Sequence, residues 1–255
     1  MKKGTLRQIL VIAATIVTVV INFLSAFLPL NGQDPGDISD MFEVFFVPAG
    51  YVFSIWGIIY LGLLAYTVYQ ALPAQRDSAL LNRVGWLYIG TCAANSIWLF
   101  MWHYLVFSAS IVFMVALLVL LILIYLALGT GRTKVGAAMR WCVRVPFSIY
   151  LGWITVATVA NATSLFNYWG WGNGLDTAAA IWAVIMLAVA TVLAVLMSLR
   201  HGDIAYVAVI VWAFVGIAVK HSGNALVATA AYVLAAVAAL SLIVGVPRAR
   251  KRMNN

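Results

Sequence analysis

The chain has 255 residues, of which 65% are hydrophobic and only 9% are charged, and its mean hydropathy is +1.04. This composition excludes a water-soluble globular domain and is typical of a membrane protein. The formal net charge of +8 does not indicate nucleic-acid binding, because no water-exposed face is left on which the basic residues could cluster.

Eight apolar runs, bounded by Pro, Gly or charged residues, are each about long enough to cross a bilayer as a helix. They lie at about 9–30, 45–72, 84–104, 107–128, 145–167, 177–199, 204–219 and 225–246. The third and fourth runs are almost continuous and as one helix would measure about 69 Å, twice the thickness of a hydrocarbon core. We therefore expect the chain to fold back between His103 and Ser110. The predicted fold class is all-α, a polytopic membrane helical bundle of about eight transmembrane helices.

The six prolines fit this division of the chain. Helices should end at Pro29, Pro73 and Pro247 and begin at Pro48 and Pro146. The remaining proline, Pro35, should lie in a loop. No proline is expected to interrupt a helix.

Charged residues are missing from the middle of every predicted span, which argues against ion-coupled transport. His103, His201 and His221 lie near span ends, where interfacial polar residues are common. Cys92 and Cys142 are far apart and outside any metal-ligand spacing, so we expect free thiols. The sequence therefore predicts neither catalytic residues nor a metal site.

Aromatic and amide side chains recur at helical spacing in three predicted spans. The candidate ligand-binding residues are Phe53, Trp56 and Tyr60 in the second span, Asn95 and Trp98 in the third, and Tyr150, Trp153, Ala157 and Asn161 in the fifth. The two asparagines lie at hydrocarbon depth, so each needs a partner from a neighbouring helix or from a ligand. Taken singly, these residues fit helix packing better; three such stripes together favour a pocket for a flat apolar ligand.

Other tryptophans have different expected roles. Five lie near span ends, as in an interfacial aromatic belt: Trp86, Trp102, Trp141, Trp169 and Trp171. The last three spans contain only Trp182 and Trp212, and we expect these spans to pack as a scaffold outside the first five.

Three blocks of sequence resemble the TspO/MBR family, the tryptophan-rich sensory proteins and translocator proteins. The blocks are PAGYVFSIWGIIY at Pro48–Tyr60, AANSIWLF at Ala93–Phe100 and PFSIYLGWITVATVAN at Pro146–Asn161. The resemblance covers about residues 8–167, so we divide the chain into a TspO/MBR-like five-helix unit at 1–167 and three additional helices with a basic tail at 168–255.

The resemblance implies a pocket for porphyrins, sterol-like molecules or aromatic drugs, lined by Trp56, Tyr60, Asn95, Trp98, Trp153, Ala157 and Asn161. The expected function is a sensor, scavenger or carrier that binds a flat hydrophobic ligand in the bilayer. No cofactor is required, although the ligand itself could be a tetrapyrrole such as a porphyrin or heme. Two alternatives stay open: a transporter or permease subunit for a small hydrophobic solute, and light-dependent degradation of a bound porphyrin. A homodimer is also left open.

The first prediction concerns topology. With the N-terminus inside, 14 of the 15 Lys and Arg residues lie on the cytoplasmic side, Lys220 lies outside, and five of the seven acidic residues lie outside. The first apolar stretch, about 22 residues, exceeds the 7 to 15 of a signal peptide and should be retained. We expect a multi-pass protein of a bacterial inner membrane with both termini cytoplasmic. A C-terminal reporter fusion should be active in the cytoplasm, and activity only in the periplasm would contradict this topology.

Overall fold

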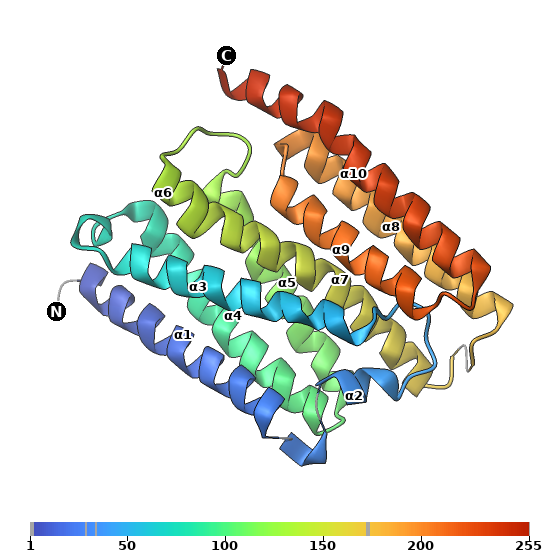
Figure 1. Cartoon of the computed structure of the whole chain (residues 1–255). Helices are drawn as coiled ribbons and strands as arrows, with labels where there is room; N and C mark the ends of the chain where they lie inside the picture. The colour runs from blue at the N-terminus through green and yellow to red at the C-terminus, as the bar shows by residue number, and fades with distance from the viewer. Residues whose placement is uncertain (1–2, 29, 34, 172–173, 255) are drawn as a thin grey trace. The chain divides into compact units, whose positions relative to one another are not determined.

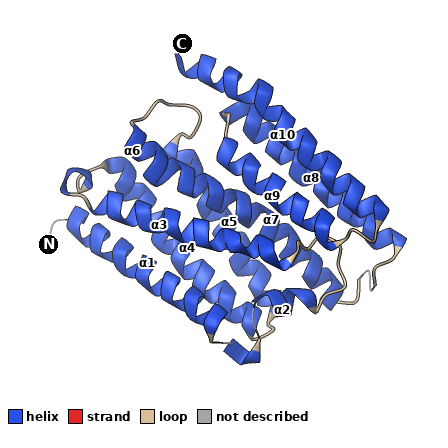
Figure 2. Cartoon of the chain, in the orientation of Figure 1, coloured by secondary structure: helices blue, strands red, loops and turns tan. Residues whose placement is uncertain are grey.

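The computed structural model describes residues 3–28, 30–33, 35–171 and 174–254, and the regular structure in these ranges is helical (Figure 1; Figure 2). In chain order the elements are α1 (Lys3–Phe27), η1 (Leu30–Gly32), α2 (Pro35–Asp40), η2 (Gly50–Ser54), α3 (Ile55–Ala71), η3 (Pro73–Gln75), α4 (Ala79–His103), α5 (Phe107–Leu128), α6 (Ala137–Met139), the π-helix η4 (Arg140–Arg144), α7 (Val145–Tyr168), α8 (Thr177–His201), α9 (Ile204–Lys220) and α10 (Ala225–Asn254).

Seven segments of the described chain are long and apolar enough to cross a membrane: Gly4–Ser25, Gly50–Ala71, Ala79–His103, Phe107–Leu128, Ala137–Tyr168, Thr177–His201 and Ala225–Asn254. The remaining predicted span corresponds to α9, a shorter apolar helix of 17 residues, or about 26 Å. The predicted all-α, multi-pass membrane fold is confirmed. The chain folds back between α4 and α5 as expected, and Leu105 in this turn has a φ of 60°.

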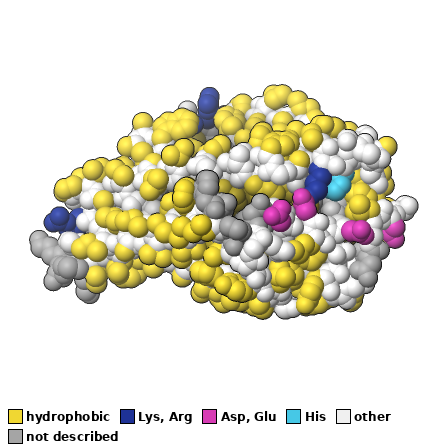
Figure 3. Space-filling view, turned by 60° about the horizontal axis from the view of Figure 1, so that its bottom comes forward, with side chains coloured by type: hydrophobic (Ala, Val, Ile, Leu, Met, Phe, Trp, Pro, Cys, Tyr) yellow, Lys and Arg dark blue, Asp and Glu magenta, His cyan; other side chains and the backbone are white. Residues whose placement is uncertain are grey.

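Apolar side chains also cover outward-facing surfaces. Ile58, Leu61 and Val68 of α3 are 56%, 70% and 66% exposed, and Leu240 and Ile243 of α10 are 60% and 68% exposed. Hydrophobic side chains are likewise abundant on the face drawn in Figure 3. Such surfaces are unfavourable in water and fit contact with lipid chains.

Three expectations about prolines are corrected. Pro247 does not end a helix but lies inside α10, which continues to Asn254; packing of α10 on α8 offsets the lost backbone hydrogen bond. Pro35 does not lie in a loop but begins α2, where a missing N–H costs nothing. Pro146 is the second residue of α7, yet helical structure starts earlier, through the π-helical turn η4. Pro29 lies outside the described residues.

The described chain forms two compact units, and the first comprises Met1–Ile38, Trp56–Gly129 and Val135–Leu151. Its core contains Tyr66, Tyr88 and Phe147, whose rings meet edge-on with centroids 4.9 to 5.8 Å apart. The Thr15 hydroxyl is hydrogen-bonded to Thr67 Oγ1 at 2.7 Å and to the Tyr88 hydroxyl at 2.9 Å. Aromatic packing and shared hydroxyl hydrogen bonds therefore join α1, α3, α4 and α7 in this unit.

Polar side chains of α1 bind backbone carbonyls at the C-terminal end of α3 and just after it. Arg7 is fully buried, and its Nη2 donates to the carbonyl oxygens of Gln75 at 3.1 Å and Gln70 at 3.5 Å. Gln8 Nε2 donates to the carbonyl oxygens of Gln70 at 2.8 Å and Leu72 at 3.1 Å. The last carbonyls of a helix lack partners inside the helix, so these contacts stabilise the end of α3.

The second unit comprises Ser39–Ile55, Thr130–Lys134 and Gly152–Asn255, and in it α8 and α10 run side by side (Figure 1). Small buried residues on the two helices allow a close approach: Ala180, Ala183, Ala190 and Ala194 on α8, and Ala231, Ala235, Ala238, Gly245 and Ala249 on α10. This is the packing that dispersion favours between helices in a membrane. The predicted division of the chain after residue 167 stays a prediction.

The closest approach of α10 to α8 yields a test of this packing. A Cβ at Gly245 would lie 2.2 Å from Ser198 Oγ and 2.4 Å from the Ser198 carbonyl oxygen. Gly245→Ala should therefore separate the helices and lower the free energy of unfolding by roughly 1 to 3 kcal/mol. Thermal unfolding in detergent measures the effect.

The matched control is Gly57→Ala in α3, because a Cβ at Gly57 meets nothing within 4 Å. This substitution should leave stability unchanged or raise it slightly through helix propensity. Equal effects of the two substitutions would contradict the close α8–α10 contact.

Candidate functional site

The first unit brings three of the predicted aromatic residues together. Trp56 and Tyr60 of α3 stack with ring centroids 5.6 Å apart and an interplanar angle of 18°. Tyr150 of α7 meets Trp56 edge-on, with centroids 6.3 Å apart, and its side chain is buried. Trp56 and Tyr60 themselves are partly exposed, so the stack has a face that a flat ring could contact.

Asn95 of α4 adds a polar group to this cluster. Its side chain is 1% exposed, and its amide lies beside the Tyr150 side chain. Asn95 Oδ1 accepts a hydrogen bond of 2.7 Å from Asn22 Nδ2 of α1. Asn95 Nδ2, in contrast, meets no acceptor at hydrogen-bond geometry among the described residues, and the Tyr150 hydroxyl is the polar group beside it. A buried amide donor without a partner costs free energy, so an acceptor on a ligand would stabilise it.

Trp98 lies one turn after Asn95 on α4 and is 9% exposed. It stacks on Trp102 with centroids 6.0 Å apart, and Trp102 meets Phe107 edge-on at 5.2 Å. Trp102 lies one residue before the end of α4, near a span end as expected, but it is only 6% exposed and faces the protein interior near the α4–α5 turn. The other four predicted belt residues, Trp86, Trp141, Trp169 and Trp171, are between 47% and 72% exposed.

The remaining predicted site residues belong to the second unit. Phe53 of η2 meets Trp153 of α7 edge-on, with ring centroids 5.7 Å apart. Trp153 and Asn161 are buried, whereas Ala157 is partly exposed. Convergence of Trp56, Asn95 and Trp153 on one ligand, as the stripes predict, would join residues of the two units and stays a prediction.

Sequence reasoning missed the partner of Asn95. Asn22 belongs to a set of buried polar residues on α1, whose spacing of three and four places them on one helix face: Thr15, Thr18, Asn22 and Ser25. In an otherwise apolar helix this polar stripe was the available signal, because polar groups at hydrocarbon depth face other helices. Thr18 Oγ1 accordingly donates to the Cys92 carbonyl of α4 at 3.4 Å.

The segment before α3, which leads to Phe53, is held by α9. The Ala49 N–H donates to the Gly216 carbonyl at 3.1 Å, and Trp212 Nε1 donates to the Val52 carbonyl at 3.1 Å. A Cβ at Gly216 would lie 2.1 Å from Val52 Cγ2, so the absence of a side chain there permits the contact. Helix α9 thus satisfies backbone groups of a segment that lacks regular pairing of its own.

The C-terminal end of α9 adds three further contacts, with Val47, Phe45 and Asp40. His221 Nε2 lies 3.2 Å from the Val47 carbonyl oxygen, so the neutral ring carries its hydrogen on Nε2. Phe45 meets the His221 ring edge-on at 5.2 Å. Lys220 forms a salt bridge with Asp40. Lys220, the one basic residue that we expect on the outer side, is therefore paired with Asp40, an acidic residue that we expect on the same side.

The candidate site residues offer aromatic faces and one amide donor in apolar surroundings. Within the described ranges, no three His, Cys, Asp or Glu side chains come close enough to hold a metal ion.

Comparison with known proteins finds one family. A family model described as TSPO-like protein matches residues 8–244. The match extends over residues 168–244, beyond the three blocks that carry the resemblance in sequence. No curated protein and no solved structure matches the chain.

The contact between His221 and Val47 predicts a pH dependence of stability. Burial lowers the pKa of His221 below its usual value of 6.5; nearby Lys220 lowers it further, and the Val47 carbonyl opposes the shift. The unfolded chain then binds the proton more readily than the folded chain. Stability should be full above about pH 6.5 and fall as the pH decreases below that value.

Thermal unfolding in detergent at about pH 7.5 and 5.5 measures this dependence. In His221→Gln, the amide can still donate to Val47 but does not titrate, so the loss of stability at low pH should be smaller. An identical loss in wild type and variant would assign the pH dependence to another group.

Proposed function

Because the chain belongs to the TSPO-like protein family, we propose that it binds a flat hydrophobic ligand of the tetrapyrrole class, such as a porphyrin, within the membrane. In this role it acts as a sensor, scavenger or carrier of the ligand. The proposed site centres on Asn95, Trp56, Tyr60 and Tyr150.

The observation that carries this proposal is the Asn95 amide. It is buried beside Tyr150, its oxygen is paired with Asn22, and its Nδ2 meets no acceptor at hydrogen-bond geometry in the described part of the chain. A porphyrin has a flat apolar ring for Trp56 and carries carboxylate and pyrrole groups that can accept a hydrogen bond. Each aromatic stacking contact would contribute about 0.5 to 1.5 kcal/mol beyond area burial.

Continuous helices favour binding over a transport path. Secondary transporters commonly hold their substrates where spans are broken near the membrane midplane. Here α3, α4 and α5 run without interruption, and the π-helical turn η4 lies at the beginning of its span. We therefore rank a transporter or permease subunit second.

The proposed location is a bacterial inner membrane with both termini in the cytoplasm. Support comes from the two ends of α9. Its N-terminal end follows Arg200 and His201 at the basic end of α8, and its C-terminal end carries the Lys220–Asp40 salt bridge. Basic residues near span ends favour the cytoplasmic side.

Titration of the purified chain with protoporphyrin, heme and a sterol, followed by tryptophan fluorescence, tests the proposal. Protoporphyrin should quench the fluorescence and bind more tightly than the sterol. Asn95→Leu and Trp56→Ala should each weaken protoporphyrin binding about tenfold, which corresponds to about 1.4 kcal/mol.

The control is Trp171→Ala, because Trp171 is 72% exposed and should not contact the ligand. Thermal unfolding establishes that each variant is folded. Unchanged affinity in both Asn95→Leu and Trp56→Ala would overturn the site. Trp153→Ala then tests convergence: a tenfold loss places Trp153 at the ligand, and no loss confines the site to the residues around Asn95.

A further inference from the structure

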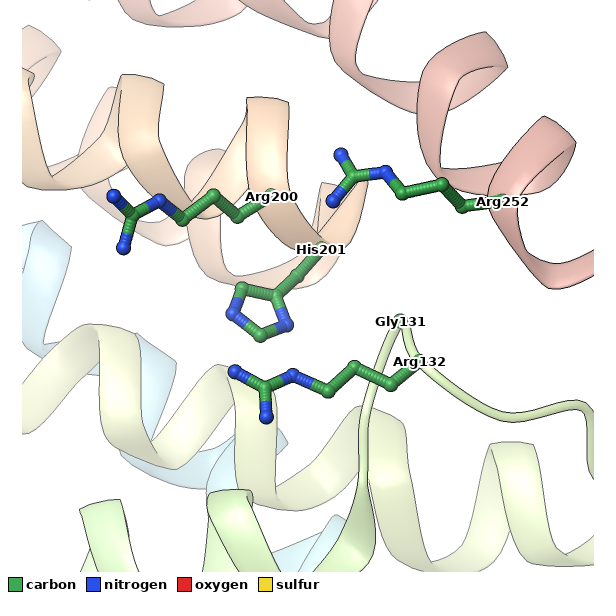
Figure 4. Close-up of a pocket in the computed structure, with 5 residues that line it drawn as sticks. All are labelled: Gly131, Arg132, Arg200, His201 and Arg252. Carbon is green, nitrogen blue, oxygen red and sulfur yellow. The ribbon is translucent and has the colours of Figure 1, made fainter.

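Three arginines gather around a hollow in the second unit. The hollow has a volume of about 470 Å³ and is lined by Gly131, Arg132, Arg200, His201 and Arg252. The arginines come from three separate elements: the loop after α5, the C-terminal end of α8 and the C-terminal end of α10. Figure 4 shows the His201 ring between the side chains of Arg132 and Arg200, with Arg252 reaching toward them from α10.

The backbone around the hollow is built to hold this arrangement. His201 Nδ1 lies 2.8 Å from the Thr130 carbonyl oxygen, which fixes the loop to α8. Gly131 has a φ of 72°, and a Cβ there would lie 2.1 Å from the His201 carbonyl oxygen. A residue with a side chain would therefore move the loop, and Arg132 with it, away from α8.

The α10 end is fixed in a similar way. Arg252 Nη2 donates to the Leu199 carbonyl of α8 at 2.6 Å. A guanidinium has five N–H donors, so this hydrogen bond leaves most of them for another acceptor. The contact also places the Arg252 charge beside the C-terminal end of α8, where a cation is favourable.

Arg132 and Arg200 have no acidic partner within the described ranges. Neither makes a hydrogen bond or an ion pair with any other described residue. The nearest acidic residue in sequence, Asp203, is buried and uses Oδ1 to accept the Tyr206 N–H at the beginning of α9. Like charges that share a small volume repel one another, and a bound anion would remove that cost.

Topology explains why basic residues lie at this end of the helices but not why three of them share one hollow. We propose that this hollow is a binding site for a phosphate group, carried either by an anionic lipid headgroup or by a soluble phosphate compound. Guanidinium groups bind phosphate oxygens through paired hydrogen bonds, and the volume suits a small ligand. The site does not depend on the proposed tetrapyrrole binding.

The experiment compares two doubly substituted full-length chains in detergent. Arg132→Gln with Arg200→Gln removes two arginines of the hollow, which make no hydrogen bonds within the described chain and should be dispensable for folding. Arg248→Gln with Arg250→Gln removes the same charge from exposed positions of α10 that do not line the hollow. Thermal unfolding checks that both chains are folded. If the chain with Arg132→Gln and Arg200→Gln is not folded, the single variant Arg132→Gln replaces it.

Two probes distinguish the sources of the phosphate. Inorganic pyrophosphate is titrated by calorimetry, and dioleoyl phosphatidylglycerol bound from mixed micelles is counted by native mass spectrometry against dioleoyl phosphatidylcholine. Binding of at least one probe should weaken tenfold or more in the Arg132/Arg200 variant and less than twofold in the control. Loss of pyrophosphate binding indicates a soluble phosphate compound, and loss of phosphatidylglycerol alone indicates a lipid headgroup. Equal weakening in both variants, or no binding of either probe to wild type, would overturn the site.

Discussion

The structure depends on one constraint: a polar group at hydrocarbon depth must find its hydrogen bond inside the protein, because the surrounding lipid offers none. The Thr15 hydroxyl meets Thr67 and Tyr88, the Asn22 amide meets Asn95, and Thr18 reaches a carbonyl of α4. Each of these contacts joins two helices. Dispersion alone leaves the rotation of apolar helices poorly determined, so these polar pairs select the faces that meet.

The same constraint applies to the polar groups of the candidate site. Asn95 Nδ2, which meets no acceptor at hydrogen-bond geometry among the described residues, lies beside Tyr150 in the cluster that also contains Trp56 and Tyr60. A ligand with a flat ring and an acceptor at its edge would satisfy both the rings and the amide. The hollow between α8 and α10 has the opposite character: its arginines are exposed, and it suits an anion from the aqueous or headgroup side.

Much of the fold followed from the sequence because its signals are local. Span positions and the turn before α5 depend on runs of apolar residues, and the family match supports the TspO/MBR resemblance that three short blocks indicate. The errors arose where distant packing decides the outcome. Pro247 stays inside α10, because contacts with other parts of the chain outweigh the local preference of proline to end a helix. For the same reason, residue spacing alone could not predict the hydrogen bond between Asn22 and Asn95 or the contacts of α9 with residues 47–52.

The central claim is that the buried Asn95 amide is completed by a ligand. An experimental structure of the full chain with protoporphyrin bound tests this most directly. We predict a ligand acceptor within about 3 Å of Asn95 Nδ2 and a porphyrin ring against Trp56. A porphyrin bound elsewhere, with Asn95 Nδ2 hydrogen-bonded only to the protein, would contradict it.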